Sequence, residues 1–171
     1  METLRETLTN TVLIGVGATA LVDAWSLLRR RMLGIALPDY GLVGRWFAHM
    51  LRGVFRHAAI SKAAPLRSER LLGWSAHYVI GVVFAALLVA LCGSAWLQAP
   101  RFVPALLLGL VTVAAPFLLM QPGMGAGIAA SRTPRPNTAR LQSLVTHAVF
   151  GCGLYASALL LRCITDFIRA V

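Results

Sequence analysis

Four polar side chains lie inside or at the edge of long apolar stretches, where they could do chemistry. Asp23, His77 and His147 lie within three of these stretches, and Gln121 follows another. Ionisable groups are expensive inside a membrane and commonly mark pathways for ions or protons. Histidine titrates near neutral pH and pairs readily with a carboxylate. We therefore expect a polar intramembrane cluster of Asp23, His77, His147 and Gln121 that translocates or senses a proton, an ion or a small solute.

Two other interpretations of the same residues stay open. Imidazole and carboxylate are ligands of divalent metals such as Zn²⁺, Fe²⁺ and Mn²⁺. His77, His147 and Asp23 would then hold the metal, and a metal-bound water would make the protein a membrane-embedded enzyme. The zinc-binding pattern H-E-x-x-H is absent from the sequence. In the remaining interpretation the Asp–His contacts only lock the helices together, as in a structural or accessory membrane subunit without catalysis.

The elements that position these residues are apolar helices. Of the 171 residues, 58% are hydrophobic and 13% are charged, and the mean hydropathy is +0.74. A spanning helix needs about 20 mostly apolar residues, and only helices of this length can satisfy their backbone in lipid. The sequence predicts an all-α polytopic membrane protein, a four-transmembrane-helix bundle in one domain, residues 1–171. Its helices are expected at about 10–29, 70–97, 102–121 and 140–163.

Charge sets the orientation of these helices. Twelve of the sixteen Arg and Lys residues fall in or next to two loops, 29–70 and 121–140, and cytoplasmic loops carry such an excess. Both termini are therefore predicted outside. The net charge of +10 is explained by topology, so we expect the lipid bilayer as partner and no nucleic acid. Four helices barely enclose a pathway, which favours a homo-oligomer for a transporter.

The loop 30–69 holds a second group of polar residues. Leu42, Trp46 and Met50 recur at helical spacing and predict a short helix at about 41–52. This helix either lies on the inner membrane surface or packs under the bundle as a plug. The cytoplasmic-side candidates for the site are Asp39, His49, His57 and Glu69. Elsewhere, Cys92 and Cys163 either pair in an oxidising compartment or stay free thiols.

An internal repeat is suggested by an offset of 70 residues. The segment RLLGWSAHYVIG from Arg70 falls on RLQSLVTHAVFG from Arg140, and seven of 22 positions in residues 70–91 are identical. His77 matches His147, and Gly81 matches Gly151. The alternative is a coincidence between two helices rich in Ala, Leu and Val. A true repeat predicts two parallel helical hairpins, as found in some transporters.

Several stretches resemble a bacterial family of small inner-membrane proteins known only as domain of unknown function 2938. They are LIGVGATALVDAW, DYGLVGRWFAHM, LGWSAHYVIGVVFAALL, PFLLMQPGMGAGIAASRTPRPN and THAVFGCGLY. The resemblance covers about residues 10–160, and MQPGMGAGIAASRTP is its most specific part. It implies a four-helix protein of the bacterial inner membrane, multi-pass, with both termini periplasmic by the charge argument. It implies no activity, substrate or cofactor.

Overall fold

The computed structural model describes residues 4–170, apart from the side chain of Arg169. Within this range the chain is helical without strands, and four segments are long and apolar enough to cross a membrane. These segments are Leu4–Leu33, Glu69–Cys92, Phe102–Met124 and Pro136–Ile168. The predicted all-α fold with four spanning helices is confirmed.

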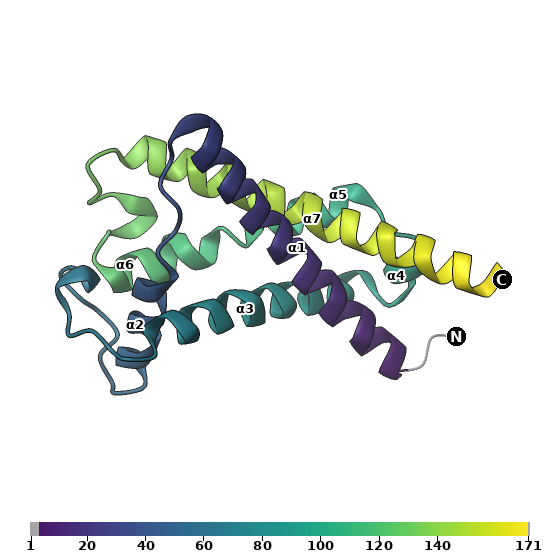
Figure 1. The fold of residues 1–171 in the computed structure, drawn as a ribbon, viewed down its shortest axis with the longest axis horizontal. Helices are drawn as coiled ribbons and strands as arrows, with labels where there is room; N and C mark the ends of the chain where they lie inside the picture. Colours follow the sequence, from purple (N-terminus) through teal and green to yellow (C-terminus); the bar gives the residue numbers. More distant parts are fainter. Residues whose placement is uncertain (1–3, 171) are drawn as a thin grey trace.

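The long helices form a row rather than a closed ring. Helices α1 (Leu4–Leu33) and α7 (Pro136–Ala170) cross in contact at the centre, α3 (Glu69–Cys92) packs on α1, and α5 (Phe102–Val111) packs on α7. Helices α3 and α5 touch only slightly. The start of α1 and the end of α7 lie together at one end of the molecule, hereafter the terminal end, as Figure 1 shows. Helices α2 (Tyr40–Met50) and α6 (Gln121–Met124) lie at the opposite end, hereafter the α2 end.

Small residues bring the helices together in both halves of the chain. A Cβ added to Gly81 of α3 would meet the Thr19 hydroxyl of α1, and one added to Gly15 would lie 2.5 Å from the Cα of Val82. In the second half, a Cβ added to Gly109 of α5 would lie 2.5 Å from the Cα of Gly151 of α7. Such close approach of backbones is typical of helices packing in lipid. Gly81 and Gly151, which match at the offset of 70 residues, thus lie at similar helix contacts. The two contacts are joined by the crossing of α1 and α7, whereas α3 and α5 touch only slightly.

Glycines also decide where the spans end. Helix α1 extends past both predicted limits and stops at Gly34, whose φ is +65°. Helix α3 ends at Cys92 instead of near 97 because Gly93 has a φ of +78°, a conformation that ends helices and suits glycine. A short helix, α4 (Ala95–Gln98), follows and buries Trp96 against the core.

The third span is broken near its middle. Helix α5 ends at Val111, and the chain resumes as a π-helical turn, Pro116–Met120, that leads into α6. Pro116 has no N–H, so the Thr112 carbonyl accepts instead from the Ala115 amide at 3.1 Å. Such interruptions are tolerated where neighbouring helices cover the backbone. Beyond α6, Ala129 and Ala130 both have positive φ, at 47° and 59°, in the short 3₁₀ turn Ile128–Ala130.

Helix α2 is held tightly against α3. The Asp39 carboxylate caps it by accepting from the Gly41 amide at 2.9 Å. A Cβ on Gly44 would collide with the backbone of Glu69 and Gly73, and one on Gly73 with the Tyr40 carbonyl. Trp46 is buried, and its indole N–H donates to the Phe55 carbonyl at 3.0 Å. Through these contacts α2 packs against α3 at the α2 end of the molecule.

Candidate functional site

Asp23 and His77 face each other because the close contact between α1 and α3 fixes the register of the two helices. Thr19 lies against Gly81. Asp23 is one turn further along α1, and His77 is one turn earlier along α3. Because the two helices run in opposite directions, these steps lead to the same level of the bundle. The His77 Nε2 and Asp23 Oδ1 atoms are 3.1 Å apart.

Two tyrosines complete the cluster around the Asp23 carboxylate. The Tyr78 hydroxyl donates to Oδ2 of Asp23 at 2.9 Å. The Tyr40 hydroxyl lies 3.5 Å from Oδ1 of Asp23 and 3.0 Å from Nε2 of His77. We call Asp23, Tyr40, His77 and Tyr78 the carboxylate cluster. It draws one residue from α1, one from α2 and two from α3.

Helix α2 covers this cluster through the Tyr40 ring. That ring stacks on the His77 imidazole, with centroids 4.3 Å apart and planes inclined by 29°. Trp74 of α3 lies on Tyr40 as well, at 4.5 Å. The close contact of Gly73 with the Tyr40 carbonyl holds the start of α2 in place. The position of α2 and the surroundings of His77 are therefore linked by direct contact.

The cluster is mostly withdrawn from solvent. The side chains of Asp23 and His77 are 19% and 18% exposed. Burial, followed by the charge of Asp23, raises the pKa of Tyr40 above its ordinary value of about 10. Tyr40 thus remains a hydrogen-bond donor to the cluster at neutral pH.

The Asp23–His77 contact can hold a proton between its two atoms. A neutral imidazole protonated on Nε2 donates to the Asp23 carboxylate. The phenols of Tyr40 and Tyr78 supply further hydrogen bonds that stabilise a carboxylate charge. Uptake of one more proton gives either an imidazolium beside the carboxylate, or a carboxylic acid that donates to Nε2 of a neutral imidazole whose own proton is on Nδ1. The arrangement can therefore take up, hold and release protons.

His147 lies in a different environment. Its Nδ1 atom is 2.9 Å from the Thr112 hydroxyl of the broken third span, and that hydroxyl donates to the Gly109 carbonyl at 2.6 Å. No hydrogen bond or ion pair joins His147 to Asp23 or His77 within residues 4–170. The structure thus brings Asp23 and His77 together and places His147 at the other helix contact.

Gln121 begins α6, and its Oε1 atom is buried without a partner among the described residues. The same residues contain no group of three or more His, Cys, Asp or Glu side chains that could hold a metal ion. The proposed ligand set of His77, His147 and Asp23 is therefore not assembled in the described part of the chain. Cys92 and Cys163, the pair considered for a disulfide, are free thiols.

The other candidates of the α2 end have structural contacts. Asp39 caps α2. Glu69 receives two hydrogen bonds from Arg45, at 2.8 and 2.9 Å, and one from the Leu66 amide. His49 lies 3.1 Å from the Ala64 carbonyl, and its ring contacts that of His57 edge-on at 5.0 Å. Both ring nitrogens of His57 are buried without partners in the region that the structure describes.

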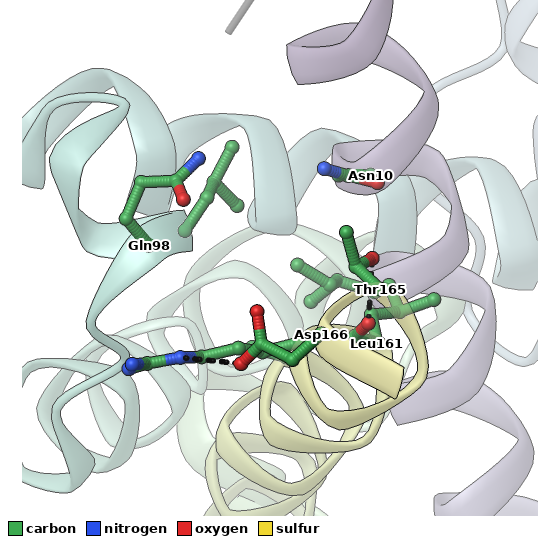
Figure 2. Close-up of a pocket in the computed structure, with 9 residues that line it drawn as sticks. Asn10, Gln98, Leu161, Thr165 and Asp166 are labelled. Carbon is green, nitrogen blue, oxygen red and sulfur yellow. Dashed lines mark hydrogen bonds and ion pairs between the residues drawn. The ribbon is translucent and has the colours of Figure 1, made fainter. Parts of the chain in front are cut away.

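A small polar pocket lies at the terminal end, far along α1 from Asp23. Asn10, Gln98, Thr165 and Asp166 surround it (Figure 2). Its volume of about 30 Å³ is the space of about one water molecule. Arg162 approaches Asp166 at 3.6 Å, and both side chains are largely exposed. The pocket shares no residue with the carboxylate cluster.

Tyr40 and Tyr78 were not among the residues singled out from the sequence. Tyr78 follows His77 directly, but an aromatic residue near the end of a span, like Trp74 beside it, is also typical of an aromatic belt at the membrane interface. Tyr40 follows the helix cap Asp39, so its place at the first turn of α2 was within reach of sequence reasoning. Its contact with His77, which lies 37 residues later in the chain, was not, because that contact depends on how α2 docks against α3.

The fold and the cluster together define a helical protein with four membrane-spanning-type helices and a buried Asp–His–Tyr cluster near one end. The chain belongs to the family described as Protein of unknown function (DUF2938), whose family model matches residues 12–161. This confirms the resemblance seen in the sequence. Searches among curated proteins and among solved structures gave no match.

Proposed function

We propose that this protein binds and releases a proton at the carboxylate cluster and uses it to translocate or sense a proton, an ion or a small solute. The observation that carries the proposal is the Asp23–His77 pair at 3.1 Å. An ionisable pair among membrane-spanning helices is costly, and a polar pair kept there is more often functional than accidental. The two phenols give the proton further neighbours within hydrogen-bonding distance.

The same proposal places the protein in a bacterial inner membrane with the α2 end in the cytoplasm. The loops and helix ends of the α2 end carry twelve Arg and Lys residues, and the positive-inside rule favours this orientation. Both termini are then periplasmic. The carboxylate cluster lies near the cytoplasmic leaflet, where protons of the cytoplasm reach it after a short path. The bilayer is the partner, and a homo-oligomer would supply the additional walls that a transport pathway needs.

Contact between His77 and α2 supports a sensing role in particular. Protonation of His77 places a positive charge under the stacked Tyr40 ring, which belongs to α2. A change in charge at His77 would therefore alter how α2 packs. The metalloenzyme alternative lacks an assembled ligand set within the described residues. The purely structural alternative predicts that loss of the pair affects stability alone.

Proton movement in reconstituted vesicles tests the proposal. Purified protein is placed in liposomes that contain a pH-sensitive dye, and a potassium diffusion potential drives protons inward. A second readout follows amide hydrogen exchange in α2 as the pH is changed. We expect wild-type protein to pass protons or to change the protection of α2 with pH, and Asp23→Asn and His77→Gln to lose that response.

His147→Gln is the matched control, because His147 holds the equivalent place in the repeat but contacts Thr112. It should retain the wild-type response. A folded Asp23→Asn variant with unchanged proton flux and unchanged α2 exchange would overturn the proposal. Equal losses in His77→Gln and His147→Gln would also contradict it, because they would point to general damage to the bundle.

A further inference from the structure

Three polar groups at the last turns of α1 lack a partner. The Nε of Arg29, the hydroxyl of Ser26 and the indole N–H of Trp25 are buried and make no hydrogen bond within the described residues. Arg29 and Ser26 are only 8% and 5% exposed as residues. A buried cation or hydroxyl without a partner costs free energy, so these groups call for an acceptor.

Among the described residues, no carboxylate forms an ion pair with Arg29. The nearest in sequence, Asp23, is already hydrogen-bonded to His77 and Tyr78. Glu69 is paired with Arg45. Arg29 instead lies over the Trp25 ring, with its guanidinium carbon 5.8 Å from the ring centroid. All three unpartnered groups can donate a hydrogen bond, and together they match an anion with several oxygen atoms.

An apolar groove begins beside the same residues. It lies between α1 and α7, has a volume of about 330 Å³, and includes Ala24, Trp25 and Leu28 from α1 and Cys152 and Ala156 from α7. The groove is open and apolar, so it offers no match for a polar solute. Trp25 belongs both to the groove and to the group of unpartnered donors. Hydrogen-bond donors suited to an anion and a groove suited to an acyl chain thus meet at the Trp25 side chain.

We propose that Arg29, Ser26 and Trp25 bind the phosphate group of an anionic phospholipid whose acyl chain lies in the groove between α1 and α7. Arginine suits phosphate because its planar guanidinium presents several N–H donors. The position of the donors along α1 agrees with a lipid headgroup, since they lie in the last two turns of the helix, next to the charged Arg30 and Arg31. The lipid would bridge α1 and α7 where they cross. This inference rests on the membrane location given in the proposed function, but not on proton binding at the carboxylate cluster.

Binding of three probes separates the two halves of the site. Native mass spectrometry of the purified protein in a neutral detergent compares phosphatidylglycerol, diacylglycerol with the same chains, and inorganic phosphate. Phosphatidylglycerol has both parts, diacylglycerol lacks the phosphate, and inorganic phosphate lacks the chains. We expect wild-type protein to bind phosphatidylglycerol about tenfold more tightly than diacylglycerol, which corresponds to about 1.4 kcal/mol.

Variants assign each half to its residues. Arg29→Gln should abolish the preference for phosphatidylglycerol, whereas Arg30→Gln, at an exposed neighbouring position, should keep it. Ser26→Ala removes only the unpartnered hydroxyl and should weaken the preference while leaving the groove and the Trp25 ring unchanged. Cys152→Trp fills the groove and should lower binding of both lipids. Its control, Cys163→Trp, changes an exposed residue of the same helix outside the groove.

Two results would overturn the assignment. Equal binding of phosphatidylglycerol and diacylglycerol by wild-type protein would show that the donors do not hold a phosphate. Inorganic phosphate bound as tightly as phosphatidylglycerol, with no effect of Cys152→Trp, would show a free-anion site instead of a lipid site. Ser26→Ala keeps the test decisive if Arg29→Gln fails to fold, because it removes a single hydroxyl that has no partner among the described residues.

Discussion

The two halves of the chain contain the same kind of helix contact, but it positions different polar groups. In the first half Gly81 packs on Thr19, and His77, one turn away, meets the Asp23 carboxylate and two phenols. In the second half Gly151 packs on Gly109, and His147, one turn away, meets the Thr112 hydroxyl. The contact is shared, but only the first half contains a group that can exchange charge with its histidine.

This difference follows from what surrounds each histidine. Helix α1 continues as a regular helix past its glycine contact and can place Asp23 opposite His77. The third span breaks at Thr112, so its backbone leaves the helix one turn after Gly109. Helix α2 packs chiefly on α3 of the first half, where Tyr40 closes over His77, and meets the second half through Trp46 against Gly123. Two similar helix contacts thus carry a carboxylate–histidine cluster in the first half and a histidine–hydroxyl hydrogen bond in the second.

Leucine at the two matching glycines should give the largest effects. Gly81→Leu and Gly151→Leu both force atoms into occupied space, and overpacking costs about 1–3 kcal/mol or more. The space beside Gly151 is filled by backbone, with the Ala105 carbonyl and the Leu106 Cα at 2.8 Å, whereas the Thr19 side chain fills that beside Gly81. Backbone yields less than a side chain, so Gly151→Leu should be the more destabilising. Thermal unfolding in a mild detergent measures the order.

Ala86→Leu is the control for both variants, because Ala86 is exposed on α3 and faces away from these contacts. It should leave the unfolding temperature close to that of the wild type. If Gly81→Leu and Gly151→Leu were as mild as Ala86→Leu, the close helix contacts of the two halves would not be real.

Replacing each histidine in turn should distinguish His77, whose partner is a carboxylate, from His147, whose partner is a hydroxyl. His77→Gln removes a hydrogen bond to a carboxylate, worth about 1.5–3 kcal/mol, and His147→Gln removes one to a hydroxyl, worth about 0.5–1.5 kcal/mol. Combined with Asp23→Asn, His77→Gln should give a non-additive change in the free energy of unfolding. The effects of His147→Gln and Asp23→Asn on the free energy of unfolding should be additive. Coupling of equal size in both cycles would mean that all three residues form one site.

Much of the fold could be predicted because its signals are local. Four apolar runs give four spans, and Pro116 inside the third indicates where that span is interrupted. The end of α3 at Cys92 was harder, because the apolar composition continues through Gly93 to Leu97. Only the positive φ of Gly93 ends the helix there. Composition gives the length of an apolar stretch, whereas the backbone conformation of a single residue decides where the helix stops.

The site was predictable in part, for a related reason. Asp23, His77 and His147 lie at similar depths from the inner ends of their predicted spans, and the structure brings Asp23 and His77 to 3.1 Å. Depth does not distinguish His147 from His77, because depth says nothing about which helices are neighbours. The row α3–α1–α7–α5 places His77 beside α1 and turns His147 toward α5. Tyr40 depended on the docking of α2 through Gly44 and Gly73, a contact between residues about 30 positions apart.

The smallest expected effect concerns alkaline pH and the Tyr40 phenol, which lies against the histidine of the first half. Burial and the Asp23 charge raise the pKa of Tyr40 in the folded protein, while the unfolded chain has the ordinary value of about 10. The protonated phenol is thus favoured by folding. Its contribution to stability is complete below pH about 10 and is lost as the pH rises toward the higher pKa of the folded state. Wild-type protein should therefore lose stability above pH about 10 more steeply than Tyr40→Phe.

Denaturant unfolding at a series of pH values between about 8 and about 11 measures that slope. Tyr155→Phe is the matched control, since it removes a phenol from α7 that packs on Phe102 at 5.4 Å and does not touch the carboxylate cluster. It should retain the wild-type slope. If Tyr40→Phe and Tyr155→Phe changed the slope equally, the Tyr40 phenol would not be set apart by its contact with Asp23. The two halves would then differ in their carboxylate alone, and α2 would cover the cluster without taking part in its hydrogen bonding.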